Sequence, residues 1–319
     1  MKKWMLALAA TAMVVCGGNA VAQNTKLLSI GTGGTGGVYY PLGGGMASIL
    51  SKHVPGWQAT AEVTGASVAN LQLIGQQKQD FGFAMADAVW DAQNGLGKFK
   101  GRKVEARTLM VLYPNKVHVV TTEGSGIQKL ADFKGKRMST GEPNSGTEVL
   151  AMRLLEAAGI AQNVQRERLS VAEGVNAIKD RKIDGLIWVG GLPTAAITDL
   201  AATPGISIKL LPHAEFADGM NKQWGPLYVK GMIPKNTYKG QTEDVPNLDV
   251  WNLLVADASM SDEMAYTIVK TLMDHKPDLV AVHREAANIT LEAQASGSPV
   301  PFHPGARKYF EQQGVKFKP

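Results

Sequence analysis

The residues of this chain with the clearest chemical potential lie in a glycine-rich turn at positions 31–37, between an apolar run and a helical pattern. Such a turn brings backbone N–H groups and a helix N-terminus close to a ligand, which favours an anionic group. Gly33 and Gly34 are the candidates for that contact. Gly31, Gly33 and Gly36 also fit the G-x-G-x-x-G pattern of dinucleotide sites, but no good acidic candidate follows about 20 positions later. A nucleotide site is therefore the weaker alternative.

Small polar and aromatic residues follow this turn and the next two predicted strands. Tyr39 and Tyr40 come directly after the glycines, and at least one of them should face a crevice. Ser67 and Asn70 begin a predicted helix, where each either serves the helix start or contacts a ligand. Asp87 follows a strand at its carboxyl end, and it either caps the next helix or contacts the ligand.

The second half of the chain offers a matching set of candidates. A predicted helix begins at residues 145–147, which could cap the helix or contact a ligand. The strand before residue 190 ends in a glycine–proline turn, and its tryptophan is expected in the core more often than in a site. The candidates in this half are Ser145, Gly146, Thr147, Trp188, Gly190 and Pro193.

Two helix N-termini, after Gly37 and at residues 145–147, would approach one small ligand if two lobes closed on it. Each N-terminus carries about half a positive charge and free N–H donors, so a carboxylate can be held without an arginine. An Asp87 carboxylate in the same crevice would repel a bare dianion and suit an ammonium group. Together these features favour an amino acid or a small dicarboxylate as the ligand.

Patterns for catalysis and metal binding are weak. The six histidines show no H-x-x-x-H or related ligand spacing. The sequence also lacks G-x-S-x-G and the lysine of a phosphate-binding loop. We therefore predict no enzyme activity, no metal site and no cofactor.

The N-terminus has the pattern of a signal peptide, with Lys2 and Lys3, an apolar stretch at 4–15 and Ala-Val-Ala at 20–22. Cleavage after Ala22 would remove Cys16, the only cysteine, as suits an exported protein that relies on its core. The formal net charge is +5 and the basic residues are scattered, which argues against a nucleic-acid partner. We predict a periplasmic protein whose mature part is long enough for two domains.

The remaining sequence alternates between strand and helix patterns. Strands are predicted at 27–32, 58–64, 81–85, 137–140, 166–170 and 185–189. Helices are predicted at 42–53, 67–77, 147–158, 173–181, 262–274 and 279–294, and residues 39–41 are expected to delay the first one. In the helix at 147–158, Arg153 and Glu156 lie outside the apolar stripe. This alternation predicts parallel sheets with crevices at the carboxyl ends of their strands.

Two long extended runs, at 109–122 and 248–256, connect the halves, which is typical of a hinged binding protein. We predict an α/β fold of the two-lobe, type II-like periplasmic binding protein class, with two parallel-rich sheets joined by two hinge crossings. After the signal peptide at 1–22, lobe 1 would comprise residues 23–118 and 251–319, and lobe 2 residues 119–250.

Over nearly the whole mature chain, seven segments in order resemble the TAXI group of solute receptors for tripartite ATP-independent periplasmic (TRAP) transporters. They are residues 30–41 (IGTGGTGGVYYP), 64–71 (TGASVANL), 112–114 (LYP), 130–137 (LADFKGKR), 144–147 (NSGT), 190–193 (GGLP) and 303–309 (HPGARKY).

The resemblance implies a receptor that closes on a small organic ligand of the glutamate, glutamine or 2-oxoglutarate class and delivers it to a TRAP-type membrane permease. It also implies that the candidates named above line the site. The chain departs from the group at Met85, where a glutamine is common, and at Asn144, where glycine is common. The alternatives are a nucleotide-dependent periplasmic enzyme and a ligand-sensing subunit of a membrane kinase.

Overall fold

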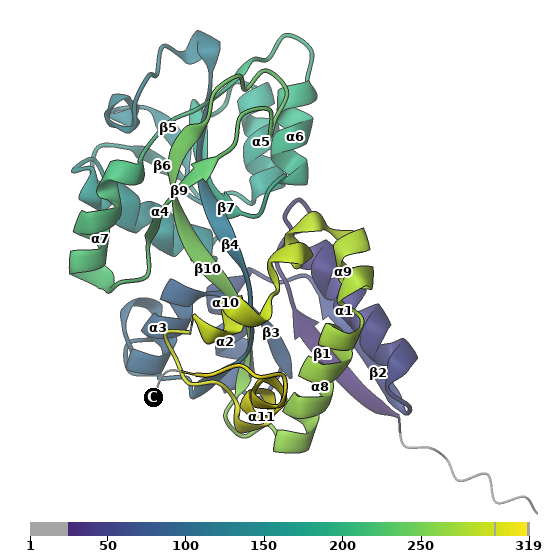
Figure 1. Ribbon diagram of the computed structural model, residues 1–319. Coiled ribbons are helices and arrows are strands. Elements are labelled where there is room, and N and C mark those ends of the chain that lie inside the picture. Colours follow the sequence, from purple (N-terminus) through teal and green to yellow (C-terminus); the bar gives the residue numbers. More distant parts are fainter. Residues whose placement is uncertain (1–24, 297, 318–319) are drawn as a thin grey trace, which may run out of the picture.

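The computed structural model describes residues 25–296 and 298–317, so the predicted signal peptide lies outside the described residues. The ribbon divides into two lobes, which two long strands connect (Figure 1). Within the described part, no helix has both the length and the apolar character needed to cross a bilayer.

The first lobe begins with alternating strands and helices. These are β1 (Lys26–Gly31), α1 (Tyr39–His53), β2 (Trp57–Glu62), α2 (Ser67–Gly75), β3 (Phe81–Met85) and α3 (Ala86–Asn94). Strand β1 pairs in parallel with both β2 and β3, so its carboxyl end and that of β3 face the same edge. The prediction that residues 39–41 delay α1 is wrong. Pro41 is accommodated because a proline in the first turn has no intrahelical N–H bond to lose.

The second lobe repeats this order with a smaller sheet. Its elements are β5 (Arg137–Ser139), α4 (Gly146–Ala157), β6 (Gln165–Glu167), α5 (Val171–Lys179), β7 (Gly185–Gly190), α6 (Ala195–Ala202), β8 (Ile208–Leu210), α7 (Ala217–Trp224) and β9 (Val229–Ile233). Strand β5 pairs in parallel with β6 and β7. The lobe thus places the N-terminus of α4 at the carboxyl end of β5.

The two connections are the long strands β4 (Ala106–Thr122) and β10 (Val245–Asp257). They pair with each other in antiparallel fashion. Strand β10 also pairs with β3 of the first lobe and β9 of the second, and β4 also pairs with β7 of the second lobe. Hydrogen bonding therefore runs through the order β2-β1-β3-β10-β4-β7-β5-β6 without a break, because the predicted hinge crossings are themselves paired strands. The lobe boundaries predicted at 118 and 250 fall within these two strands and stay a prediction.

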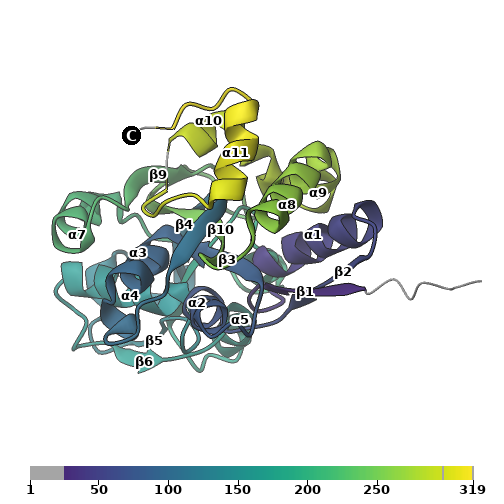
Figure 2. The same cartoon turned by 90° about the horizontal axis from the view of Figure 1, so that it is seen from below.

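The C-terminal part returns to the first lobe as α8 (Asp262–Asp274), α9 (Lys276–Val282), η5 (Arg284–Asn288), α10 (Leu291–Ala295) and α11 (Pro304–Gln312). The continuous helix predicted at 279–294 is wrong, since His283 is extended and Thr290 caps a new helix. Helices α1, α8, α9 and α11 lie on one face of the first lobe's strands, and α2 and α3 lie on the other (Figure 2).

Apolar side chains fill both faces. One core cluster joins α1, α8 and α11 through residues such as Leu42, Ile268 and Phe310. The other joins α2 and α3 to α4 of the second lobe, where Leu150 and Leu154 follow the predicted apolar stripe. This shared cluster brings the helices that border the crevice into direct contact.

Candidate functional site

A small cavity lies between the lobes. Its lining comes from the glycine turn, the first turns of α2 and α4, the middle of β4 and the end of β7. The lining residues are Gly33, Gly34, Gly37, Val38, Tyr39, Ala66, Ser67, Met85, Tyr113, Asn115, Glu142, Ser145, Gly146, Thr147, Trp188, Val189 and Gly190.

Four helices begin at this cavity. The N-cap residues of α1, α2 and α3 are Val38, Ala66 and Met85, and none of them caps its helix with a side chain. Ser145 caps α4 by accepting a hydrogen bond of 2.9 Å from the Glu148 N–H. Helix N-termini carry partial positive charge. At the start of α2 the Ala69 N–H already donates to the Asn144 carbonyl, and at the start of α3 the Ala88 N–H donates to Asp87 Oδ1. The cavity therefore offers positive potential to a carboxylate without a basic side chain.

The floor of the cavity is a polar network on β4 and β10. The Tyr39 hydroxyl donates to Asn252 Oδ1, and Asn115 Nδ2 donates to the same oxygen over 2.8 Å. Among the described residues, the buried Tyr113 hydroxyl and Asn115 Oδ1 have no hydrogen-bond partner. Burial raises the pKa of Tyr39 and Tyr113, so both hydroxyls keep their protons. An unpaired buried polar atom is costly, which makes these two atoms natural partners for a ligand.

Glu142 supplies the single acidic side chain of the lining. Its Oε1 lies against the glycine turn of the other lobe, 3.8 Å from where a Cβ on Gly34 would stand. Burial, with a smaller contribution from the nearby Glu173, raises the pKa of Glu142. In the described parts of the chain its carboxylate has no ion-pair partner, and no lysine or arginine lines the cavity.

Apolar walls close the cavity on two sides. The Trp188 ring lies close to the glycine turn, since a Cβ on Gly37 would stand 3.0 Å from it. Its Nε1 donates to Thr194 Oγ1 over 2.9 Å, which fixes the ring. The Met85 methyl group approaches Gly146 across the lobes, within 2.7 Å of the place of a Cβ there. The glycines are therefore needed for close approach of the lobes.

A sequence model of the NMT1-like family matches residues 30–314. The chain belongs to the NMT1-like family. Because the match covers the glycine turn, both hinge strands and the C-terminal helices, it includes every element that lines the cavity of this NMT1-like protein.

Solved structures resemble the NMT1-like chain at low sequence identity. A protein from Bordetella bronchiseptica RB50 is 16% identical with a TM-score of 0.54, over 93% of this chain and 84% of that one. The ligand-binding component of an ABC-type import system from Staphylococcus aureus, with zinc bound, is 12% identical with a TM-score of 0.50, over 92% and 94%. These likenesses show a shared fold, the α/β, type II-like fold of periplasmic binding proteins that the sequence predicts.

Nine of the twelve candidate residues line the cavity. They are Gly33, Gly34, Tyr39, Ser67, Ser145, Gly146, Thr147, Trp188 and Gly190. Ser67 does not cap its own helix, because its hydroxyl accepts a hydrogen bond of 3.1 Å from the Met85 N–H. Ser145 is both a cap and a lining residue, so its two predicted roles are compatible.

The other three candidates lie outside the lining. Asn70 is fully buried and donates to the carbonyls of Thr32 and Phe83, over 2.8 and 2.9 Å. The Pro193 carbonyl faces His283 Nε2 at 3.4 Å, so its turn contacts the C-terminal segment. Both residues support the walls of the cavity from behind.

Asp87 is the third candidate, and the predicted ligand contact of its carboxylate is not found. Its side chain is fully buried, its Oδ2 accepts from the Tyr228 hydroxyl over 3.1 Å, and Arg153 lies 3.5 Å away. Burial raises the pKa of Asp87, and the Arg153 guanidinium opposes that shift. Arg153, which we expected outside the apolar stripe of α4, is itself buried because it reaches α3 of the other lobe. The Asp87 Oδ1 atom accepts from the Ala88 N–H over 2.9 Å, so of the two predicted roles Asp87 serves the start of α3. It also joins the lobes and does not line the cavity.

Sequence reasoning missed Tyr113, Asn115 and Glu142 as lining residues. A signal for the first two was present, since the Tyr-Pro-Asn sequence interrupts an otherwise apolar strand. Asn144, a departure from the TAXI pattern, has a φ of 63°, a left-handed conformation that glycine and asparagine adopt most readily. Asparagine in place of the group's glycine therefore preserves the turn. Met85, in place of the group's glutamine, brings an apolar group to the cavity.

Proposed function

We propose that this NMT1-like protein is a periplasmic solute receptor of the TAXI type, which binds a small amino acid in the interlobe cavity and delivers it to a TRAP-type permease. Glutamate and glutamine are the leading ligands, and 2-oxoglutarate is the leading alternative. The observation that carries the proposal is the pairing of uncapped helix N-termini with one partnerless carboxylate, Glu142, in the same cavity.

The α-carboxylate and the ammonium group of an amino acid each have a partner of matching chemistry in this cavity. The N-termini of α1, α2 and α4 suit the α-carboxylate, and the Tyr113 hydroxyl can donate to it. Glu142 and Asn115 Oδ1 are acceptors and suit the ammonium group. A keto acid lacks that ammonium group and would leave both acceptors unpaired. This argument favours an amino acid over 2-oxoglutarate.

The assignment to a TRAP system depends on the seven segments that resemble the TAXI group. The predicted signal peptide agrees with a periplasmic location. The structural neighbours share the fold alone, and one of them is described as part of an ABC-type import system. A permease gene beside the gene for this chain would support transport, and a membrane kinase gene in that place would support sensing.

A thermal-shift screen of the mature protein, refolded to remove bound ligand, tests the ligand class. A ligand at about 100 times its dissociation constant stabilises a protein by about 2.7 kcal/mol, which raises the melting temperature by several degrees. We expect this rise with glutamate or glutamine and a smaller one with 2-oxoglutarate. A rise with NAD alone would support the nucleotide-dependent enzyme and contradict the receptor.

A further inference from the structure

Two histidines that are far apart in the sequence meet on the first lobe, away from the interlobe cavity. His53 is the last residue of α1, and His275 follows α8 directly. Their rings stack with centroids 3.6 Å apart and an angle of 23° between the planes. The histidine spacing along the sequence gave no sign of this pair.

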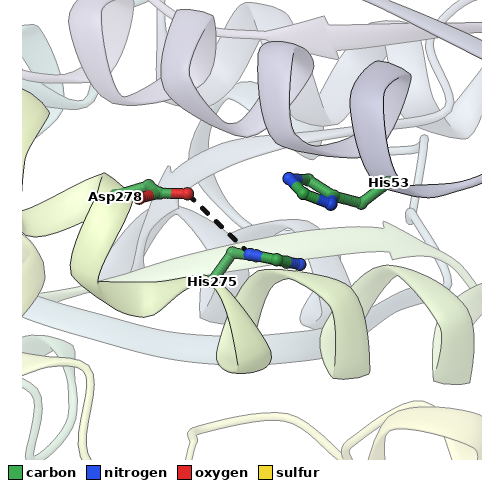
Figure 3. Close-up of side chains that lie close together, drawn as sticks. All are labelled: His53, His275 and Asp278. Atoms are coloured by element: carbon green, nitrogen blue, oxygen red, sulfur yellow. Dashed lines mark ion pairs between the residues drawn. The ribbon is translucent and has the colours of Figure 1, made fainter.

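A carboxylate completes the cluster. Asp278, in the first turn of α9, has its Oδ2 3.8 Å from Nδ1 of His275. Figure 3 shows the two rings stacked, each with a nitrogen on the side of the Asp278 carboxylate. Donor atoms from all three side chains lie within 4.8 Å of one another. Two imidazoles and one carboxylate form a ligand set that zinc uses in proteins, with the fourth position open.

One ring nitrogen of His53 is available to bind a metal. Its Nε2 atom is buried and, within the described part of the chain, has no hydrogen-bond partner. An imidazole nitrogen without a hydrogen-bond partner can bind a metal without first losing a hydrogen bond.

The backbone adds negative potential at the same place. Helices α1 and α8 both end there, and the C-terminus of a helix carries about half a negative charge. The neighbouring Lys52 opposes a cation, since it places a positive charge beside His53. Lys276 points elsewhere, because its Nζ donates to the Ala287 carbonyl over 3.0 Å. Asp278 and the C-termini of α1 and α8 thus contribute negative potential, and Lys52 and the N-terminus of α9 oppose it.

We propose that His53, His275 and Asp278 form a binding site for a divalent transition metal of the zinc class, with the fourth position open to water. Tetrahedral zinc with bonds of about 2.0–2.1 Å brings its ligand atoms to about 3.3 Å from one another. The donors must therefore move closer than their present separations, and the two rings must turn out of their parallel stack, because the nitrogen lone pair that binds a metal lies in the plane of each ring. Side-chain rotation allows both changes, since Asp278 is exposed and both histidines are partly exposed. A bound metal would join the end of α1 to the α8–α9 corner.

Zinc titration by calorimetry tests the proposal on the mature protein, prepared without a histidine tag and freed of metal with a chelator. We expect one zinc ion per chain, and a thermal shift of several degrees on binding. His53→Gln should weaken zinc binding at least tenfold, and Asp278→Asn should weaken it severalfold. Cobalt in place of zinc should give the visible absorption of a tetrahedral site in the wild type and lose it in His53→Gln.

Asp274→Asn is the matched control, because Asp274 is an exposed carboxylate next to His275 that pairs with Lys270. Zinc affinity should stay unchanged in this variant. Absence of one-to-one binding in the wild type overturns the proposal, and so does equal affinity in wild type, His53→Gln and Asp278→Asn. Circular dichroism and amino-acid binding confirm that each variant is folded. Because the site lies outside the interlobe cavity, its failure would leave the proposed receptor function untouched.

Discussion

Arg153 on α4 donates a hydrogen bond of 2.6 Å from its Nη2 atom to Asp91 on α3, and this contact joins the two lobes. Its Nη1 atom donates to the Tyr228 hydroxyl over 2.9 Å and lies 3.5 Å from Asp87. Both aspartates belong to the first lobe and Arg153 to the second. The guanidinium therefore balances buried negative charge across the boundary between the lobes.

Replacement of this arginine should favour the open form. Arg153→Met leaves two buried carboxylates without their cation, and breaking such a pair typically costs about 3–5 kcal/mol. We expect affinity for glutamate or glutamine to fall at least tenfold and the radius of gyration in saturating ligand to rise. Small-angle scattering and calorimetry measure these two effects.

Lys182→Met is the control for that experiment, because it removes an exposed ion pair with Asp180 within one lobe. Exposed pairs contribute about 0–1 kcal/mol, so affinity and radius should stay at wild-type values. Equal effects of the two variants would contradict a role of Arg153 in closure.

The pH dependence of ligand binding should report Glu142. Its pKa is raised by burial, so in the free protein the carboxylate gains a proton at a higher pH than an ordinary glutamate does. An ammonium group binds the ionised form, so affinity for an amino acid should fall as the pH falls through this raised pKa. Titrations between about pH 4 and about pH 8 measure the effect.

Glu142→Gln should remove that pH dependence and weaken glutamate or glutamine binding more than 2-oxoglutarate binding. Loss of a buried charged partner typically reduces affinity by orders of magnitude. Glu123→Gln, an exposed acidic position in the same lobe, should leave both affinities unchanged. Equal losses for the amino acid and the keto acid in Glu142→Gln would refute the ammonium contact.

A methyl group at Gly146 should block closure. Its Cβ would stand 2.7 Å from both the Met85 methyl group and the Ser67 hydroxyl, which belong to the other lobe. We expect Gly146→Ala to lower ligand affinity at least tenfold while the free protein remains folded. Affinity at the wild-type value would mean that the lobes accommodate the extra methyl group.

Gly44→Ala is the matched control within a helix. Nothing lies within 4 Å of a Cβ at this position of α1, so the substitution should not disturb packing. Alanine exceeds glycine in helix propensity by about 0.5–1 kcal/mol, and the free energy of unfolding should rise by about that amount. Ligand affinity should not change.

Two buried histidines should make the fold sensitive to acid. Burial lowers the pKa of His118 and of His213 to about 4, from 6.5 in a model peptide. Between these values the unfolded chain binds more protons than the folded one, so stability is full above about pH 6.5 and falls as the pH approaches 4. The loss should be on the order of 3 kcal/mol per histidine. Urea unfolding at a series of pH values checks this slope, and a flat profile would contradict it.

Local patterns predicted most strands and helices well, because short buried strands and apolar stripes leave a clear period in the sequence. The strand at 81–85 and the helix at 262–274 have the predicted bounds. The prediction of one continuous helix at 279–294 failed because of a contact with a residue far away in the sequence. Glu285 sits in a separate short helix, where its Oε1 accepts from the Leu192 N–H over 2.7 Å. No local sequence pattern near Glu285 predicts the contact with Leu192.

The cavity was predicted in part for a similar reason. Glycines and helix starts at strand ends are local signals, and most of the residues chosen that way line the cavity. Asp87 and Glu142 are both acidic residues that follow strands, and only their distant partners distinguish them. Arg153 lies 66 positions after Asp87 in the sequence, and their contact depends on how the lobes meet. The stacking of His53 on His275 was not predicted either, because these residues are far apart in the sequence.

The paired strands β4 and β10 have a mechanical consequence. Their register shifts between Trp251 and Leu253 and again between Leu254 and Val255, and the first shift lies close to where Asn115 and Asn252 meet the cavity floor. A bulge bends the strand that carries it and increases its local twist, so bending of the connection is favoured at this level. The lobes can then rotate about this level while the hydrogen bonds above and below it are kept. Ligand groups that contact Asn115 would touch the pivot itself, so occupancy of the cavity and the angle between the lobes are set at the same point.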